Sequence, residues 1–243
     1  MIRTPAFDEE ELELMKSIFL QNLKINKEKT SFLVSQLIRK MIFGNHPYGT
    51  SLEEKDVEAL HREELRSFHH SNFRPAAIFV TTHPSVTAEE IITRFSLLTS
   101  PAPDSGNLPI VSSGKKNEHI AKDGVQTSLR LANRSLNRKD RHYPDLLLFN
   151  HILGGYFGSR LMKNIREEKG LTYGIYSSIN PFAHESFFVI GADVNKENRD
   201  LALDEIRKEI KRMRTEAVDA SELEIARNHF LGSLQSEVAN PFR

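Results

Sequence analysis

The chain has 243 residues, 39% of them hydrophobic and 27% charged, a composition typical of a globular protein with one large or two smaller domains. Its 33 basic and 33 acidic residues cancel, so net charge favours neither nucleic acid nor an anionic membrane as a partner. Because cysteine is absent, disulfides, thiolate metal ligands and a cysteine nucleophile are excluded, while either side of a membrane stays possible as the compartment.

The first 98 residues are predicted to be rich in helix. Asp8 with Glu11 resembles a capping box and predicts a helix over residues 8–25. Thr30 is predicted to cap a second helix that Gly44 ends. Three further helices are predicted: a short one opened by Ser51 with Glu54, one at residues 62–73, and one at residues 88–98 that Thr87 with Glu90 caps. Residues 76–82 are predicted to form a strand, because they are rich in apolar and β-branched side chains.

Residues 99–118 change in composition, because proline, serine and glycine become frequent. This segment is predicted to be a linker between a first domain, residues 1–98, and a second domain, residues 119–243. The second domain is predicted to contain strands at 125–133, 171–179 and 185–194, helices at 143–155 and 159–170, and two final helices from Lys196 and Ser221. No apolar run reaches the roughly 18 to 20 residues that a membrane-spanning helix needs, and the acidic start is unlike a signal peptide.

Several kinds of catalytic site are not supported by the sequence. The ten histidines, among them His61, His69, His70, His142 and His151, form no H-E-x-x-H or H-x-x-E-H motif, so no metal site is predicted. Ser159 lacks the G-x-S-x-G context of a nucleophile elbow. The run "GGYFGSR" follows a predicted helix and matches no phosphate-binding loop, and Gly154 and Gly155 within it predict a turn between two helices.

One short stretch, "REEKGLTY", brings together an arginine at a helix end and a tyrosine early in a strand. Gly170 is predicted to end the helix in a left-handed conformation, with Arg166 before it and Tyr173 after it. Arg166 could simply complement the helix dipole, and Tyr173 could be a half-buried packing residue. Alternatively, the guanidinium and the phenol converge as hydrogen-bond donors to a carbonyl or an oxyanion.

The segment "ILGGYFGSRLMKNIREEKGLTYGIYSSI" resembles the second domain of pitrilysin/insulinase-type (inverzincin) zinc peptidases, in particular the processing-peptidase-like branch. The upstream segment "HPYGTSLEEKDVEALHREELRSFHHSNFRPAAIFVT" resembles the end of the first domain in that family. The resemblance implies an α+β fold of two homologous, α/β-sandwich-like domains, each with helices packed on an antiparallel or mixed sheet. It also implies zinc-dependent hydrolysis of extended peptides, in which Arg166 and Tyr173 hold the substrate backbone near the metal.

The sequence departs from this family in what it lacks. The zinc-binding H-x-x-E-H segment is absent, the first domain resembles a truncated one, and the end of the second domain also looks missing. The distal zinc-ligand glutamate of the family falls near Gln21 and Asn22, and an amide is a poor substitute for a carboxylate on zinc. Zinc is therefore expected in a partner subunit or in a missing segment.

These departures favour a non-catalytic subunit or domain that lends Arg166 and Tyr173 to a zinc-bearing homologue in a heterodimer, or to a second copy in a homodimer. One alternative is a fragment of a complete zinc peptidase whose metal-binding half lies elsewhere. Another is a non-enzymatic core subunit with the same fold, although a pure scaffold has no need of the arginine and the tyrosine.

Overall fold

The computed structural model describes residues 5–72, 85–95, 109–112, 114 and 116–238. The chain divides into two units, one formed by residues 1–26 and 52–108 and the other by residues 27–51 and 109–243. Residues 27–51 therefore group with the second half of the chain. That the chain consists of two homologous domains joined at residues 99–118 stays a prediction, and the strand predicted at 76–82 lies outside the described residues.

The first unit is helical in the part that the structure describes. Its helices are α1 (Glu9–Lys27, whose last residue belongs to the second unit), α3 (Glu54–Glu58), α4 (Arg62–Asn72) and α5 (Ala88–Phe95). Asp8 caps α1 through hydrogen bonds from the N–H groups of Glu10 and Glu11, at 2.9 and 3.3 Å, and Thr87 with Glu90 caps α5, both as predicted. The predicted start of α3 was wrong, because Glu53 and Asp56 form its capping box in place of Ser51 and Glu54.

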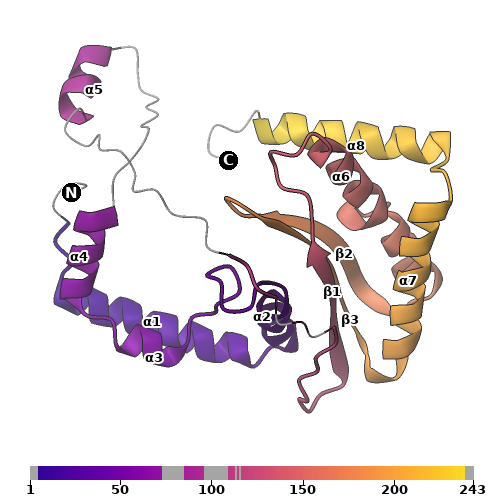
Figure 1. Cartoon of the computed structure of the whole chain (residues 1–243), viewed down its shortest axis with the longest axis horizontal. Coiled ribbons are helices and arrows are strands. Elements are labelled where there is room, and N and C mark those ends of the chain that lie inside the picture. Colours follow the sequence, from indigo (N-terminus) through magenta and orange to yellow (C-terminus); the bar gives the residue numbers. More distant parts are fainter. Residues whose placement is uncertain (1–4, 73–84, 96–108, 113, 115, 239–243) are drawn as a thin grey trace. The chain divides into compact units, whose positions relative to one another are not determined.

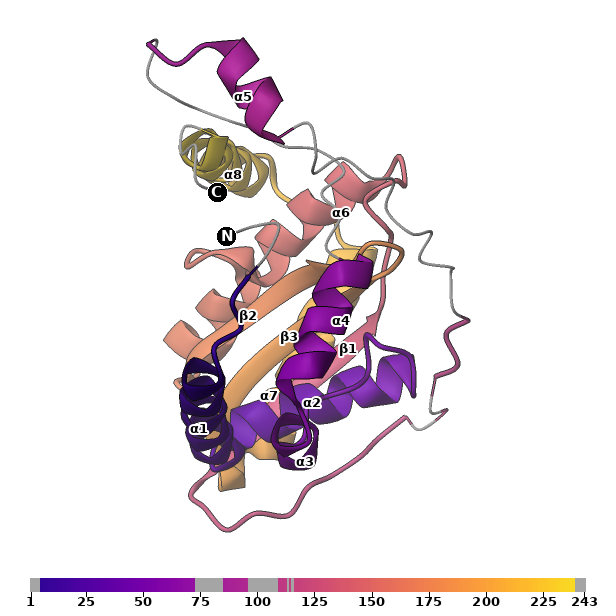
Figure 2. The same cartoon turned by 90° about the vertical axis from the view of Figure 1, so that its left-hand side faces the viewer.

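The second unit is a three-stranded antiparallel sheet with helices on both faces (Figures 1 and 2). The strands β1 (Gln126–Arg134), β2 (Thr172–Pro181) and β3 (Ser186–Asn195) lie in the order β1-β3-β2, so β2 is at an edge. One face carries α6 (Tyr143–Asn150), η2 (His151–Gly155), η3 (Met162–Glu168) and α7 (Arg199–Thr215). A short 3₁₀ turn, η4 (Lys196–Asn198), precedes α7. The last helix, α8 (Ala220–Val238), packs on α6 and η2. These elements match the helices and strands predicted for residues 119–243.

The opposite face of the sheet carries α2 (Thr30–Phe43), which packs on β1. Gly44 ends α2 with a φ of 57°, as predicted. The prediction that Thr30 caps α2 was wrong, because Lys29 is the N-cap residue. The Thr30 hydroxyl lies 2.8 Å from the Ser128 hydroxyl of β1 and so ties α2 to the sheet.

Alternation along β3 explains why the central strand of this sheet is buried on both sides. Ile190, Ala192 and Val194 point into a core shared with η3 and α7, while Phe187 and Val189 point into a second core under α2. Because successive side chains of a strand face opposite sides, one apolar strand supplies both cores. The predicted class, helices packed on an antiparallel sheet, is confirmed for this unit.

Candidate functional site

The helix that carries Arg166 is wound as a π-helix and ends in a left-handed glycine. Met162 and Ile165 are buried against the sheet. At its end, the N–H of Gly170 bonds to the carbonyl of Arg166 at 3.1 Å, and the N–H of Leu171 bonds to the carbonyl of Ile165 at 3.0 Å. Gly170 has a φ of 63°, a conformation that glycine adopts without a steric penalty. The break between η3 and β2 is therefore held by two backbone hydrogen bonds that run from Gly170 and Leu171 back to η3.

The Arg166 guanidinium lies over an aromatic ring. Its Cζ atom is 4.7 Å from the centroid of Phe157, which is itself 62% exposed. A cation over a ring face is attracted by the ring quadrupole, and this contact uses none of the guanidinium's five N–H donors in a conventional hydrogen bond. The stretch that holds Phe157 follows the paired glycines and was interpreted from sequence only as a turn, so its contact with Arg166 was missed.

Tyr173 lies on a β-bulge at the edge of the sheet. Thr172 pairs with Val194 of β3, and Ile175 pairs with Ala192. Tyr173 and Gly174 therefore both lie opposite Asp193, the single residue between Ala192 and Val194. The Thr172 hydroxyl donates to the carbonyl of Asp193 at 2.6 Å. Such a bulge interrupts the ladder and re-aims a side chain, and bulges are frequent beside active sites. Tyr173 is 91% exposed, so it is not the half-buried packing residue that one interpretation of the sequence allowed.

Arg166, which is half-buried, and Tyr173, which is exposed, flank the Gly170 turn as two hydrogen-bond donors from adjacent elements of one unit. They share no hydrogen bond with each other within residues 116–238, and over the same range no carboxylate forms an ion pair with Arg166. A partly exposed guanidinium without an ion pair and an exposed phenol can both donate hydrogen bonds to a ligand with acceptor oxygens. A substrate-binding role for the two residues stays a prediction.

Gly154 lies where the backbone of η2 approaches β2. A Cβ atom at this position would lie 2.6 Å from the Ser177 nitrogen and 2.9 Å from a methyl carbon of Leu161. The Ser177 hydroxyl reinforces the contact by donating to the Asn150 carbonyl at 3.1 Å. At Gly155 the corresponding distances are wider, 3.2 Å to the Asn150 carbonyl and to the His151 ring. The requirement for glycine is therefore mainly steric, and it is strictest at position 154.

His151 forms an aromatic cluster with α8 that the sequence did not predict. Its Nε2 atom is 3.1 Å from Nδ1 of His229, and its ring stacks on Tyr156 at 4.6 Å. Burial, followed by the neighbouring His229, lowers the pKa of His151 below the ordinary value of 6.5. His142 lies elsewhere, bonded to Asp145 at 2.9 Å, so the sequence pair His142 and His151 is not a site.

The lowered pKa of His151 predicts a loss of stability in mild acid. The unfolded chain binds a proton at His151 below pH 6.5, whereas the folded chain does so only below a lower pKa. Folding is therefore opposed as the pH falls through this interval. We expect the thermal midpoint of unfolding to decrease as the pH is lowered from 7.5 to 5.5. His151→Gln should make this decrease smaller. Carboxyl groups with lowered pKa, such as those of Glu205 and Glu222, act only below about their ordinary value of 4.5.

His119, which is exposed, provides the matched control for this measurement. His119→Gln should keep the full pH dependence of the thermal midpoint. An unchanged slope in His151→Gln would refute the role of the buried cluster.

A zinc ion does not fit the residues that the structure describes. Among them, no group of three or more histidine, cysteine, aspartate or glutamate side chains converges as metal ligands would, and three or four such ligands are needed for zinc. Gln21 and Asn22 are exposed on α1, and their correspondence to the ligand position stays a prediction. Across the same residues, no helix is long and apolar enough to span a membrane.

Comparison with known proteins gives a consistent family assignment. The family model of the peptidase M16 inactive domain matches residues 59–230. A zinc protease of Rickettsia bellii, itself uncharacterized, is 28% identical over 243 residues, which cover 97% of this chain and 58% of the relative. The uncharacterized zinc protease YmxG of Bacillus subtilis is 23% identical over 235 residues, which cover 94% of this chain and 57% of the relative.

A solved structure with the same fold is the peptidase M16 inactive domain from Pseudomonas fluorescens. It is 27% identical, superposes with a TM-score of 0.84, and is matched over 95% of this chain and 57% of its own. The chain thus spans less than three fifths of each of these three proteins. The resemblance to pitrilysin/insulinase-type peptidases is confirmed: by its matched family model, its zinc-protease relatives and its fold, the chain belongs to the peptidase M16 family, through the inactive domain.

Proposed function

We propose that this chain is the substrate-binding, non-catalytic part of a zinc-dependent peptidase, and that Arg166 and Tyr173 hold the backbone of an extended peptide. The observation that carries the proposal is the pair of donors at the Gly170 turn, with Arg166 partly exposed and Tyr173 91% exposed on a β-bulge. Because Tyr173 is exposed, its ring contributes little hydrophobic stabilisation to the fold. Binding a ligand is therefore the better physical reason for its placement.

In this proposal, the N–H groups of Arg166 donate hydrogen bonds to a carbonyl oxygen of the bound peptide. The place of Arg166 over Phe157, in preference to an ion pair with a carboxylate, supports this role, because the contact with the ring holds the guanidinium without neutralising its charge. Tyr173 donates a hydrogen bond from its hydroxyl group to the oxyanion that develops at the scissile carbonyl, or to the carbonyl next to it. Donors already in place cost no reorganisation as the negative charge develops.

The edge of β2 supports an extended conformation of the peptide. Because β2 pairs only with β3 in the described sheet, its outer edge has no strand partner there, and in this proposal that edge takes the peptide as a further strand. A peptide that adds to a sheet edge is bound through its backbone, with little demand on its sequence. Zinc and the general base belong, in this proposal, to a partner chain, either a zinc-bearing homologue or a second copy.

A second candidate is that one longer polypeptide carries both the metal site and this domain. Two observations favour it: the relatives are named zinc proteases, and they are longer than this chain. In that case the assignment of Asn22 to the zinc-ligand position is wrong. In both candidates the roles of Arg166 and Tyr173 are the same.

The deciding experiment measures zinc content and peptidase activity of the full-length protein, first alone and then with any co-purifying chain. We expect no stoichiometric zinc in the chain alone and activity only after a zinc-bearing partner is added. Zinc and activity in the lone chain would support the second candidate. A folded complex without peptidase activity under either condition would refute both and leave the scaffold role.

A further inference from the structure

Two carboxylates are buried on the face of α7 that packs against η3. Glu205 is 5% exposed and Glu209 only 1%, and they lie one helical turn apart. Like charges at this spacing repel each other, and burial raises the cost of holding both in ionised form. Their placement therefore requires compensation by the surrounding residues.

Cations compensate much of this charge. Lys208 donates to Glu205 at 2.7 Å, and Arg212 donates to Glu209 at 3.0 Å. Lys169, at the end of η3, lies 3.5 Å from Glu205. The hydrogen bond from Lys208, the largest effect, lowers the pKa of Glu205.

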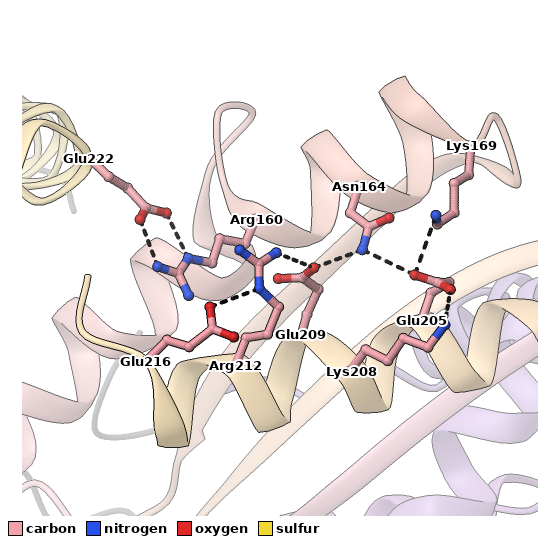
Figure 3. A network of polar contacts seen from close by, with 9 residues as sticks. All are labelled: Arg160, Asn164, Lys169, Glu205, Lys208, Glu209, Arg212, Glu216 and Glu222. Carbon is pink, nitrogen blue, oxygen red and sulfur yellow. Dashed lines mark hydrogen bonds and ion pairs between the residues drawn. The ribbon is translucent and has the colours of Figure 1, made fainter. Parts of the chain in front are cut away.

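Asn164 is the neutral member of this network, and it bridges the two carboxylates. Its amide nitrogen donates to Glu209 at 2.7 Å and to Glu205 at 3.3 Å, and Figure 3 shows it reaching both from the helix above α7. Hydrogen bonds to a charged acceptor are stronger than neutral ones, and a buried carboxylate that loses its donor is costly. The bridge therefore ties η3 firmly to α7.

Polar ties lie before, within and directly after the π-helical winding of η3. Arg160 donates to Glu222 of α8 at 2.8 and 2.7 Å, and Asn164 and Lys169 follow at intervals of four and five residues. Asn164 lies within the π-helical residues Met162–Glu168, whereas Arg160 precedes them and Lys169 is their C-cap residue. The Lys169 N–H bonds to the Asn164 carbonyl at 3.1 Å, five residues back, as in a π-helix.

Arg166 lies on the other side of the same helix. Two residues along a π-helix correspond to a rotation of roughly 160°, so a helix that presents Asn164 to α7 presents Arg166 away from it. π-helical turns are rare and are found preferentially at functional sites. Relaxation to α-helical winding would rotate Arg166 relative to Gly170 and Phe157.

We propose that Asn164 and Glu209 are positioning residues, which keep η3 in its π-helical winding and thereby aim the Arg166 guanidinium at the bound peptide. This inference rests on the proposed role of Arg166 in peptide binding. It adds a dependence of substrate binding on a buried network that touches no substrate.

The test is a double-mutant cycle on peptide hydrolysis by the full-length protein in its active assembly. Asn164→Asp keeps the shape of the side chain, removes the donor and places a third carboxylate beside Glu205 and Glu209. We expect kcat/KM to fall on the order of 10-fold to 100-fold, the range in which small misplacements of binding groups act. In the Arg166→Ala background, the same substitution should cost less than about twofold, because the group that it misplaces is already gone.

Two further variants keep the test decisive. Glu209→Gln retains an acceptor for Asn164 but loses the charge, so it should fold and show a smaller loss of kcat/KM, again only when Arg166 is present. Asp204→Asn removes an exposed carboxylate from the same helix and should leave kcat/KM unchanged. Thermal unfolding of each variant identifies losses that arise from misfolding.

The outcomes separate this inference from the function on which it rests. Equal losses with and without Arg166, or no loss in Asn164→Asp and Glu209→Gln, would overturn the positioning role while Arg166→Ala still impairs hydrolysis. If Arg166→Ala itself is without effect, the proposed function fails, and the inference with it.

Discussion

Arg166→Ala is expected to lower the peptidase turnover of the active assembly by on the order of 100-fold to 1000-fold, the usual cost of losing one donor to a developing oxyanion or substrate carbonyl. Tyr173→Phe should act in the same direction, because it removes only the hydroxyl group. Folding should be unaffected, since Tyr173 is 91% exposed and the Arg166 side chain makes no ion pair within residues 116–238. Steady-state kinetics of peptide hydrolysis, with circular dichroism of each variant, would measure both effects.

Matched controls come from the same two elements. Lys163→Ala removes an exposed cation from η3, and Tyr176→Phe removes the hydroxyl of a tyrosine on β2 that is 44% exposed. Both controls should keep turnover within about twofold, as surface substitutions away from a site usually do. Wild-type turnover in Arg166→Ala and Tyr173→Phe would exclude a substrate-binding role for the pair.

Gly154→Val is expected to destabilise the second unit severely, and Gly154→Ala already by at least about 2 kcal/mol, in the range of strongly overpacked sites. The reason is that a Cβ atom at Gly154 would lie 2.6 Å from the backbone nitrogen of Ser177 and 2.7 Å from its hydroxyl oxygen. Backbone cannot move aside without breaking the packing of η2 on β2. Chemical denaturation followed by circular dichroism would give the change in unfolding free energy.

Two other glycines separate the possible causes of this effect. At Gly174 a Cβ atom meets nothing within 4 Å, so Gly174→Ala should be nearly neutral. Gly170 has equally open surroundings but a φ of 63°, so Gly170→Ala should cost on the order of 1 kcal/mol through backbone conformation alone. A Gly154→Val protein as stable as the wild type would mean that η2 does not pack on β2 as described.

Gly170 and Gly154 differ in whether the requirement for glycine arises locally or from a distant residue. A glycine before a strand and after a cationic helix end predicted the left-handed turn at Gly170, because that requirement is a property of the residue's own φ angle. The paired glycines were also predicted to form a turn, but Gly154 has a φ of −158°, which other residues adopt. Its requirement comes from Ser177, 23 positions further along the chain, and no local pattern contains that distance.

The elements of the second unit, its mixed α and antiparallel β class, and the family of the chain were determined by the sequence itself. Apolar periodicity, caps and glycine stops act over a few residues, and the "REEKGLTY" motif with its flanks identifies the family without coordinates. Thr30 shows the limit of local reasoning, since its hydroxyl lies against Ser128 of β1 in preference to capping its own helix. Thr30 could cap its own helix or bond to a distant strand, and the packing of α2 on the sheet selects the contact with the strand.

The support of the candidate site depends on contacts between residues that are distant in the sequence. Charged residues of α7 are typical of a solvated helix face, yet Glu205 and Glu209 are buried because Asn164 lies across from them. Phe157 under Arg166, the bulge that carries Tyr173, and the pairing of His151 with His229 likewise join positions from different elements. Their energies depend on distances between side chains, and these distances exist only once the sheet and its helices have packed.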